Sequence, residues 1–250
     1  MILTLPVSHL INRENYQLIP EIKALEYREP IPVFNNKLDI LFHTGDGVVQ
    51  EEFVDYFDSI AEYLNQNKIK MFSFDLGPAC EKVEYQNYCY IAKSKILSKL
   101  RLLELVKLRI EYVRSKYTGV LALENLNYFN QPPYFHVCDP DFITEAVLQN
   151  DVYMVLDVAH AMITAKNMKM DIYTYLSNLP LDRIKEIHLS TPGTEKGEWR
   201  DQHEKPGAEI FKILEFIMKY NELQPYVTIE YYRDFKAIKN SYIALNDYFN

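Results

Sequence analysis

The chain is poor in cysteine and glycine and has no long apolar run. Its 250 residues include only seven glycines and three cysteines, Cys80, Cys89 and Cys138. The cysteine spacing fits neither a CxxC motif nor a disulfide framework, which predicts reduced thiols. No stretch reaches the roughly 18 uninterrupted apolar residues of a membrane span, and the N-terminus lacks the pattern of a signal peptide. We therefore expect a cytoplasmic protein with no membrane partner.

Basic patches and phosphate-binding motifs are also missing. The chain has 27 Lys and Arg against 35 Asp and Glu, a formal charge of −8, and acids interrupt its basic stretches. Because non-specific nucleic-acid binding depends on neutralising phosphates, this balance disfavours a nucleic-acid partner. No Gly-rich phosphate loop or nucleophile elbow is present, which disfavours the enzyme classes built on those motifs.

Short apolar runs recur along the whole chain. A length of 250 residues with 48% hydrophobic content suffices for one large core, and single-domain α/β barrels commonly have this length. The runs predict eight strands, at 2–5, 22–27, 38–43, 69–75, 119–124, 152–157, 184–189 and 226–230.

Most of these strands are followed by a helical pattern. The patterns cover 49–64, 91–117, 141–148, 170–176, 208–220 and 235–249. In the longest pattern, an apolar stripe predicts core packing and consists of Leu97, Leu100, Leu103, Val106, Ile110 and Val113. Nearly continuous apolar strands alternating with helices predict a single (β/α)8 TIM barrel, an α/β fold, over residues 1–250.

The predicted strands end in side chains that bind metals. His43, Asp75, Glu124, Asp157, His188 and Glu230 close six successive strands. In a barrel these ends point to one face, where catalytic groups gather. Burying carboxylates and imidazoles together costs free energy unless cations or hydrogen bonds offset the loss of water. The pattern therefore predicts a metal site.

Three further candidates lie just beyond strands. His160 follows Asp157 by three residues on one loop, and the Gly/Pro/Thr loop after His188 ends in Asp201-Gln-His203. Any one residue has a structural explanation, such as Asp157 capping a helix or Glu230 holding a buried arginine. Together the candidates exceed the four to six ligands of one ion, which favours two or three metals. His9 and His136 lack such a context and are left outside the site.

Several motifs resemble two branches of the xylose-isomerase-like barrel superfamily. The run Glu124-Asn-Leu-Asn-Tyr128, the segment 154–167 and Leu179-Pro-Leu-Asp-Arg through Ser190 are similar to the multinuclear non-heme iron-dependent oxidative enzymes. The order of the candidate ligands also resembles the zinc site of endonuclease IV-type enzymes. The chain departs from the first branch at His160, where that family usually has Asn, and from both branches at Asp75, where they have His.

The first resemblance implies two or three iron ions and oxygen-dependent modification of a peptide, often at cysteine, with the peptide delivered by a partner protein. Its ligands would be His43, Asp75, Glu124, Asp157, His160, His188, Asp201, His203 and Glu230, with Glu124, Asp157, His188 and Glu230 as the catalytic set and Asn125 orienting the imidazoles.

Alternative functions remain open at this point. The same ligands could serve a zinc or manganese phosphodiester hydrolase. A sugar or sugar-phosphate isomerase or epimerase would use Glu124 and Glu230 as acid and base, but needs fewer histidines than this chain offers. A barrel that binds metal only structurally is the fourth hypothesis, which the Asp75 departure encourages.

Overall fold

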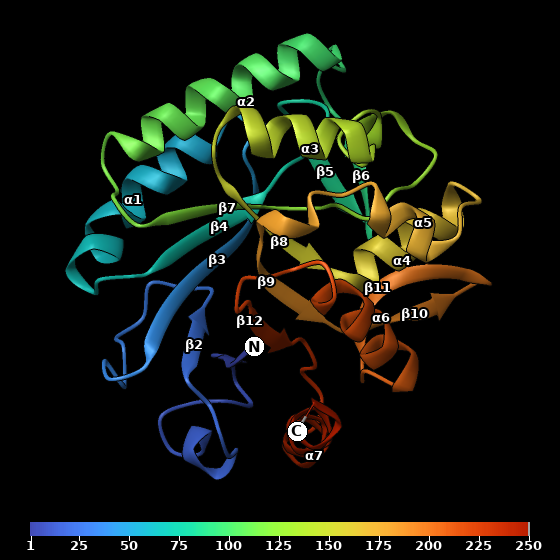
Figure 1. Ribbon diagram of the computed structural model, residues 1–250. Helices are drawn as coiled ribbons and strands as arrows, with labels where there is room; N and C mark the ends of the chain where they lie inside the picture. The colour runs from blue at the N-terminus through green and yellow to red at the C-terminus, as the bar shows by residue number, and fades with distance from the viewer. Residues whose placement is uncertain (250) are drawn as a thin grey trace.

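A computed structural model describes residues 1–249 of the chain (Figure 1). Eight parallel strands close into a barrel in the order β1-β12-β9-β8-β7-β4-β3-β2. They are β1 (Ile2–Pro6), β2 (Ala24–Tyr27), β3 (Asp39–Gly47), β4 (Met71–Asp75), β7 (Val120–Glu124), β8 (Tyr153–Asp157), β9 (Ile184–Leu189) and β12 (Tyr226–Ile229). Each predicted strand corresponds to one of these, so the predicted TIM barrel is confirmed.

Helices surround the barrel, and two antiparallel hairpins accompany it (Figure 1). The helices are α1 (Phe53–Gln66), α2 (Lys99–Arg114), α3 (Pro140–Gln149), α4 (Val158–Asn167), α5 (Ile172–Ser177), α6 (Ala208–Met218) and α7 (Phe235–Phe249), with short 3-10 turns at Tyr16–Leu18, Pro132–Tyr134 and Leu181–Arg183. The hairpins are β5 (Val83–Gln86) with β6 (Cys89–Ala92), and β10 (Thr191–Glu195) with β11 (Glu198–Glu204). Across residues 1–249, every helix is too short or too polar to cross a lipid bilayer.

The inside of the barrel changes from apolar to polar along the strand direction. One apolar cluster fills its lower part and consists of Ala24, Leu41, Met71, Ala122, Val155 and Tyr226. Because successive side chains alternate across a strand, the residue two positions further points to the same interior. Those residues are Glu26, His43, Ser73, Glu124, Asp157 and Thr228, all buried. The strand pleat therefore places one polar layer above the apolar layer.

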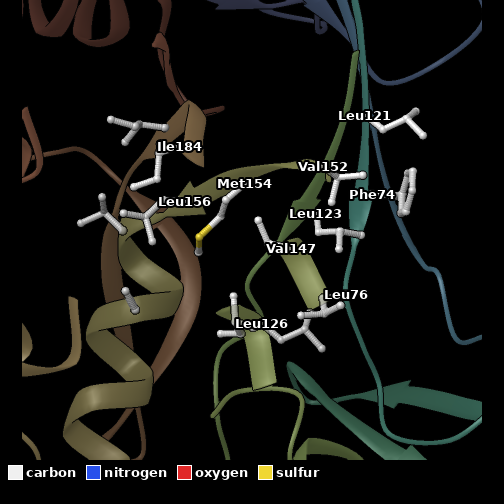
Figure 2. Close-up of a cluster of buried hydrophobic side chains, with 14 of the residues drawn as sticks. Phe74, Leu76, Leu121, Leu123, Leu126, Val147, Val152, Met154, Leu156 and Ile184 are labelled. Carbon is white, nitrogen blue, oxygen red and sulfur yellow. The ribbon is translucent and has the colours of Figure 1, made fainter. Parts of the chain in front are cut away.

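On the opposite face, β7 and β8 pack against helix α3. Figure 2 shows Leu121 and Leu123 of β7 and Met154 and Leu156 of β8 with Val147 of α3 in one apolar cluster. With both faces of the strands buried, the sequence reads as continuous apolar runs.

The helical prediction for residues 91–117 is wrong at its start. Residues Cys89–Ala92 form the second strand of a hairpin, and α2 begins only at Lys99, after Ser98 accepts a hydrogen bond from the Arg101 amide. Leu100 is therefore in the first turn, and its side chain is 69% exposed rather than packed in the core. The rest of the predicted stripe is correct from Leu103 onward, where the side chains are buried.

Two predicted loops are regular structure. The segment between His188 and His203 folds into the β10–β11 hairpin, and His160 lies in the first turn of α4 rather than on a loop. Helix α4 had no helical signature in the sequence because seven of its ten residues are buried, so no polar face alternates with an apolar one.

The aromatic packing around β4 gives a stability prediction. The fully buried Phe72 ring lies 5.1 Å from the ring of Phe74 and 5.9 Å from that of Phe57. We expect Phe72→Ala to lower the free energy of unfolding by about 3–5 kcal/mol because it leaves a cavity. The control Leu100→Ala removes an exposed side chain and should change it by less than about 0.5 kcal/mol. Urea denaturation followed by circular dichroism measures both; equal losses would contradict the packing described.

Candidate metal centre

The structure brings all nine candidate ligands to one end of the barrel. Five lie at or next to the end of a strand: Asp75, Glu124, Asp157, His188 and Glu230. His43 lies inside β3, which continues to Gly47. His160 comes from α4, and the β10–β11 hairpin supplies Asp201 and His203. Six of the nine are buried, and His160, Asp201 and His203 are partly exposed at the rim.

Glu124 lies at the centre of the group and contacts imidazoles on two sides. Its Oε2 lies 2.9 Å from Nε2 of His43, and its Oε1 lies 3.2 Å from Nδ1 of His188. The other nitrogen of the first imidazole, Nδ1 of His43, lies 3.0 Å from the hydroxyl of Ser73. Ser73 therefore orients the His43 ring so that Nε2 faces the interior of the site.

Asn125 and Asp157 connect β7 to β8 and to the start of α4. Asn125 Nδ2 donates to the backbone carbonyl oxygen of Asp157 (3.1 Å), and Asn125 Oδ1 accepts from the backbone N–H of Asp157 (2.9 Å). Asp157 Oδ1 caps α4 by accepting from the His160 amide (2.7 Å), and the His160 ring Nδ1 lies 2.8 Å from the Asn125 carbonyl oxygen. Asn125 thus orients one of the imidazoles, and Asp157 both caps a helix and faces the site.

The β10–β11 hairpin closes one side of the site. Asp201 Oδ2 lies 3.3 Å from Nε2 of His160, and Nε2 of His203 lies 3.1 Å from Glu230 Oε2. His203 has a φ of 47°, in the left-handed region that non-glycine residues rarely occupy. Arg233 fixes this part of β11 by donating a hydrogen bond to the backbone carbonyl oxygen of Gln202 (3.0 Å).

Two buried carboxylates and one arginine at the site were not among the predicted ligands. Glu26 of β2 and Glu186 of β9 are fully buried, and Arg28 forms ion pairs with both Glu26 and Glu230. The signal for Glu26 was present, because the apolar run 22–27 contains one acid at an inward position. Glu186 has the same signal, because it lies two residues before His188 in the run 184–189 and so points to the same side of the strand. His9 and His136, left outside the site, are exposed residues of other cavities.

In the candidate metal centre, the negative carboxylates and the positive imidazoles compensate one another's charge. Burial opposes ionisation of Glu124, but the charges of His43 and His188 outweigh it and hold the Glu124 pKa well below its usual range. Burial raises the pKa of Asp157 to about 7, against the attraction of His160. The partners Glu230 and Asp201 outweigh burial and raise the pKa of His203 to about 9. In the metal-free protein, protonated imidazoles therefore supply the positive charge that a cation would otherwise provide.

Asp75 shares this environment. Burial, followed by the charge of Glu124, raises its pKa well above the usual value. Its carboxylate lies within one donor group together with His43 and Glu124, so it could bind a metal ion there although it is shorter than histidine.

Donor atoms at this end of the barrel meet the geometric needs of metal ions. Within the described residues, four groups have ligand atoms all within 4.8 Å of one another: Glu26, His43 and His188; His43, Asp75 and Glu124; Glu124, Asp157 and His160; and Asp157, His188 and Glu230. Asp157 Oδ2 and Asp201 Oδ1 are buried without a hydrogen-bond partner. Such orphaned atoms are costly unless a cation or proton joins them, so the residues fit metal binding.

A cavity of about 410 Å³ opens onto the donor atoms. Tyr85 and Tyr90, paired across the β5–β6 hairpin, line it together with Tyr134, and the rings follow one another at 5.5 and 6.1 Å. The remaining wall includes Arg28, the single Lys or Arg of its lining. The site therefore combines buried carboxylates and imidazoles with an aromatic wall.

Comparisons with solved structures agree with this barrel. The 3-keto-D-glucoside 4-epimerase YcjR from E. coli is 16% identical, with a TM-score of 0.65 over 99% of each chain. A xylose isomerase domain protein from Planctomyces limnophilus is 10% identical, with a TM-score of 0.64 over 99% of this chain and 94% of that one. At these identities the likeness shows the xylose-isomerase-like fold alone.

Sequence relatives are closer but match over shorter segments. A UPF0276 protein of Vibrio parahaemolyticus is 28% identical over 100 residues, 38% of this chain and 35% of that protein. One from Acaryochloris marina is 32% identical over 82 residues, 33% of this chain and 30% of that protein. The chain thus spans about a third of the length of these curated relatives. The family described as RiPP precursor modification enzyme MbnB/TglH/ChrH matches residues 81–244, more than half of the chain, and the protein belongs to that family.

Proposed function

We propose that this protein is an oxidative enzyme with two or three iron ions that modifies a peptide, at a cysteine-type residue. The observation that carries the proposal is the sharing of residues between neighbouring donor groups. Glu124 belongs to two of the four groups, and so does Asp157. A carboxylate has two oxygens and can bridge two ions, so shared carboxylates are what a multinuclear centre requires.

Three sets of ligands follow from the contacts. His43, Asp75 and Glu124 would hold one ion, and Asp157, His188 and Glu230 a second; Glu124 and Asp157 also form a donor group with His160, so each would be shared with a neighbouring ion. The rim contacts of His160, Asp201 and His203 would hold a third. Iron bound there would supply the electron-transfer and oxygen chemistry that protein side chains lack.

The chain itself positions the reacting partners. Ser73 and Asn125 fix the orientations of two imidazoles, and outer hydrogen bonds of this kind raise metal affinity. The Tyr85–Tyr90–Tyr134 wall would give a substrate an aromatic surface beside the donor atoms. An aromatic wall of this kind can pack against an apolar peptide side chain.

The alternative functions have weaker support. A phosphodiester hydrolase needs cationic groups for the phosphates, but Arg28 is already paired with Glu26 and Glu230. A sugar isomerase needs one divalent ion, and the surplus of buried imidazoles would then have no function. A partner protein that delivers the peptide is part of the proposal and follows from the family alone.

Metal content tests the nuclearity and the metal. We expect the protein, purified without oxygen, to contain two or three irons per chain by elemental analysis, because the donor groups are shared. Mössbauer or EPR spectra of the same sample should change when air and a thiol are added. Zinc or manganese alone, with spectra indifferent to oxygen, would contradict the oxidative proposal and favour hydrolysis or isomerisation.

Ligand substitutions test the site. We expect His188→Ala and Asp157→Asn each to lose at least one bound metal ion per chain, because each residue belongs to a donor group. Asn retains the side-chain oxygen that caps α4, so the barrel should stay folded by circular dichroism.

His136→Ala is the matched control, because it removes an exposed imidazole outside the site and should leave the metal content unchanged. Metal content that is the same in all three variants and the wild type would rule out the assigned ligands.

A further inference from the structure

The carboxylate of Glu26 is fully buried beside the site and forms a donor group with His43 and His188, yet it belongs to none of the three proposed ligand sets. Its Oε2 has no hydrogen-bond partner in the described structure. Oε1 lies 2.9 Å from Nη2 of Arg28, and Oε2 lies 3.6 Å from Nε2 of His188. The second oxygen is thus directed at the ring of a proposed ligand.

The two nitrogens of His188 face different surroundings. Nδ1 faces the proposed centre, 3.2 Å from Glu124 Oε1 and 3.5 Å from Glu230 Oε1. Nε2 is buried without a hydrogen-bond partner and faces Glu26 and Glu186. A neutral imidazole that binds metal through Nδ1 carries its proton on Nε2 and needs an acceptor there.

Glu26 is the better acceptor of the two. Glu186 Oε1 lies farther from Nε2, at 3.8 Å, and already accepts a hydrogen bond from the Thr228 hydroxyl (2.9 Å). Glu26 Oε2 has no competing donor, and Arg28 holds the other oxygen. A shift of about half an ångström would bring Nε2 and Oε2 to hydrogen-bond distance.

We propose that Glu26 is a positioning residue that accepts the Nε2 proton of His188 and so directs Nδ1 at the metal centre. The inference rests on the proposed function, since it concerns a ligand of the proposed centre. Arg28 extends the arrangement, because its Nη2 contacts Glu26 and the proposed ligand Glu230 together. Glu26, Arg28 and Glu230 therefore set the position of two ligands through one connected group of charges.

The test compares Glu26→Gln and Glu26→Met with the wild type. Gln keeps an oxygen that accepts a hydrogen bond more weakly than a carboxylate does. Met keeps a similar volume but has no such oxygen. Arg28 keeps its ion pair with Glu230 in both variants. Binding of Fe(II) is measured without oxygen against a competing chelator, together with metal stoichiometry and the unfolding temperature of the metal-free protein. We expect unchanged stoichiometry and an affinity about 10- to 100-fold lower in Glu26→Met, with a smaller loss in Glu26→Gln.

Glu186→Gln is the matched control, an equally buried carboxylate near the same nitrogen, and should keep wild-type affinity. An equal loss in Glu186→Gln, or no loss in Glu26→Met, would overturn the proposal, and loss of one whole ion would make Glu26 a ligand instead. A second measurement does not depend on the variants: nitrogen NMR of the zinc-loaded wild type should find the His188 proton on Nε2, and a proton on Nδ1 would overturn the inference.

A wild type that binds neither iron nor zinc would instead refute the proposed function itself.

Discussion

The constraint on which the site depends is the two-residue alternation of side chains in a closed parallel barrel. Because every second residue of a strand points inward, residues at the same height on eight strands form a layer. Here the lower layer is apolar apart from Glu186, which is in register with Tyr226 and Val155, and the next layer is polar. Moving a strand by one residue would exchange its inward and outward sets, so the same register that buries the core also assembles the candidate ligands.

That layer carries more negative charge than the protein alone compensates well. The acids at this end are Glu26, Asp75, Glu124, Asp157, Glu186, Asp201 and Glu230, and Arg28 is the cation among them. Protonated histidines and acids with raised pKa values restore the balance in the metal-free protein. Burying charges is expensive, which is why such an arrangement belongs to a binding site rather than to a core built for stability.

Much of this was predictable from the sequence, for a local reason. All eight barrel strands were identified because strands covered on both faces are continuous apolar runs, and His43, Glu124 and His188 stood out as polar residues within or at the end of such runs. The parts that were missed depend on tertiary contacts. Helix α4 is buried nearly all round, and Leu100 lies outside the core because the helix starts later. The ligand roles themselves stay predictions.

The hairpin origin of Asp201 and His203 has a consequence for how a cluster would assemble. Seven of the nine candidates are held by the barrel strands and the first turn of α4, whereas these two lie on a ribbon attached through Arg233 and through Lys166, whose Nζ lies 3.8 Å from the ring centroid of Trp199. Contacts of that kind are the first to open in local fluctuations. The rim position is therefore expected to fill last and empty first, so that a protein short of metal would hold a defined, partly filled centre rather than a random mixture.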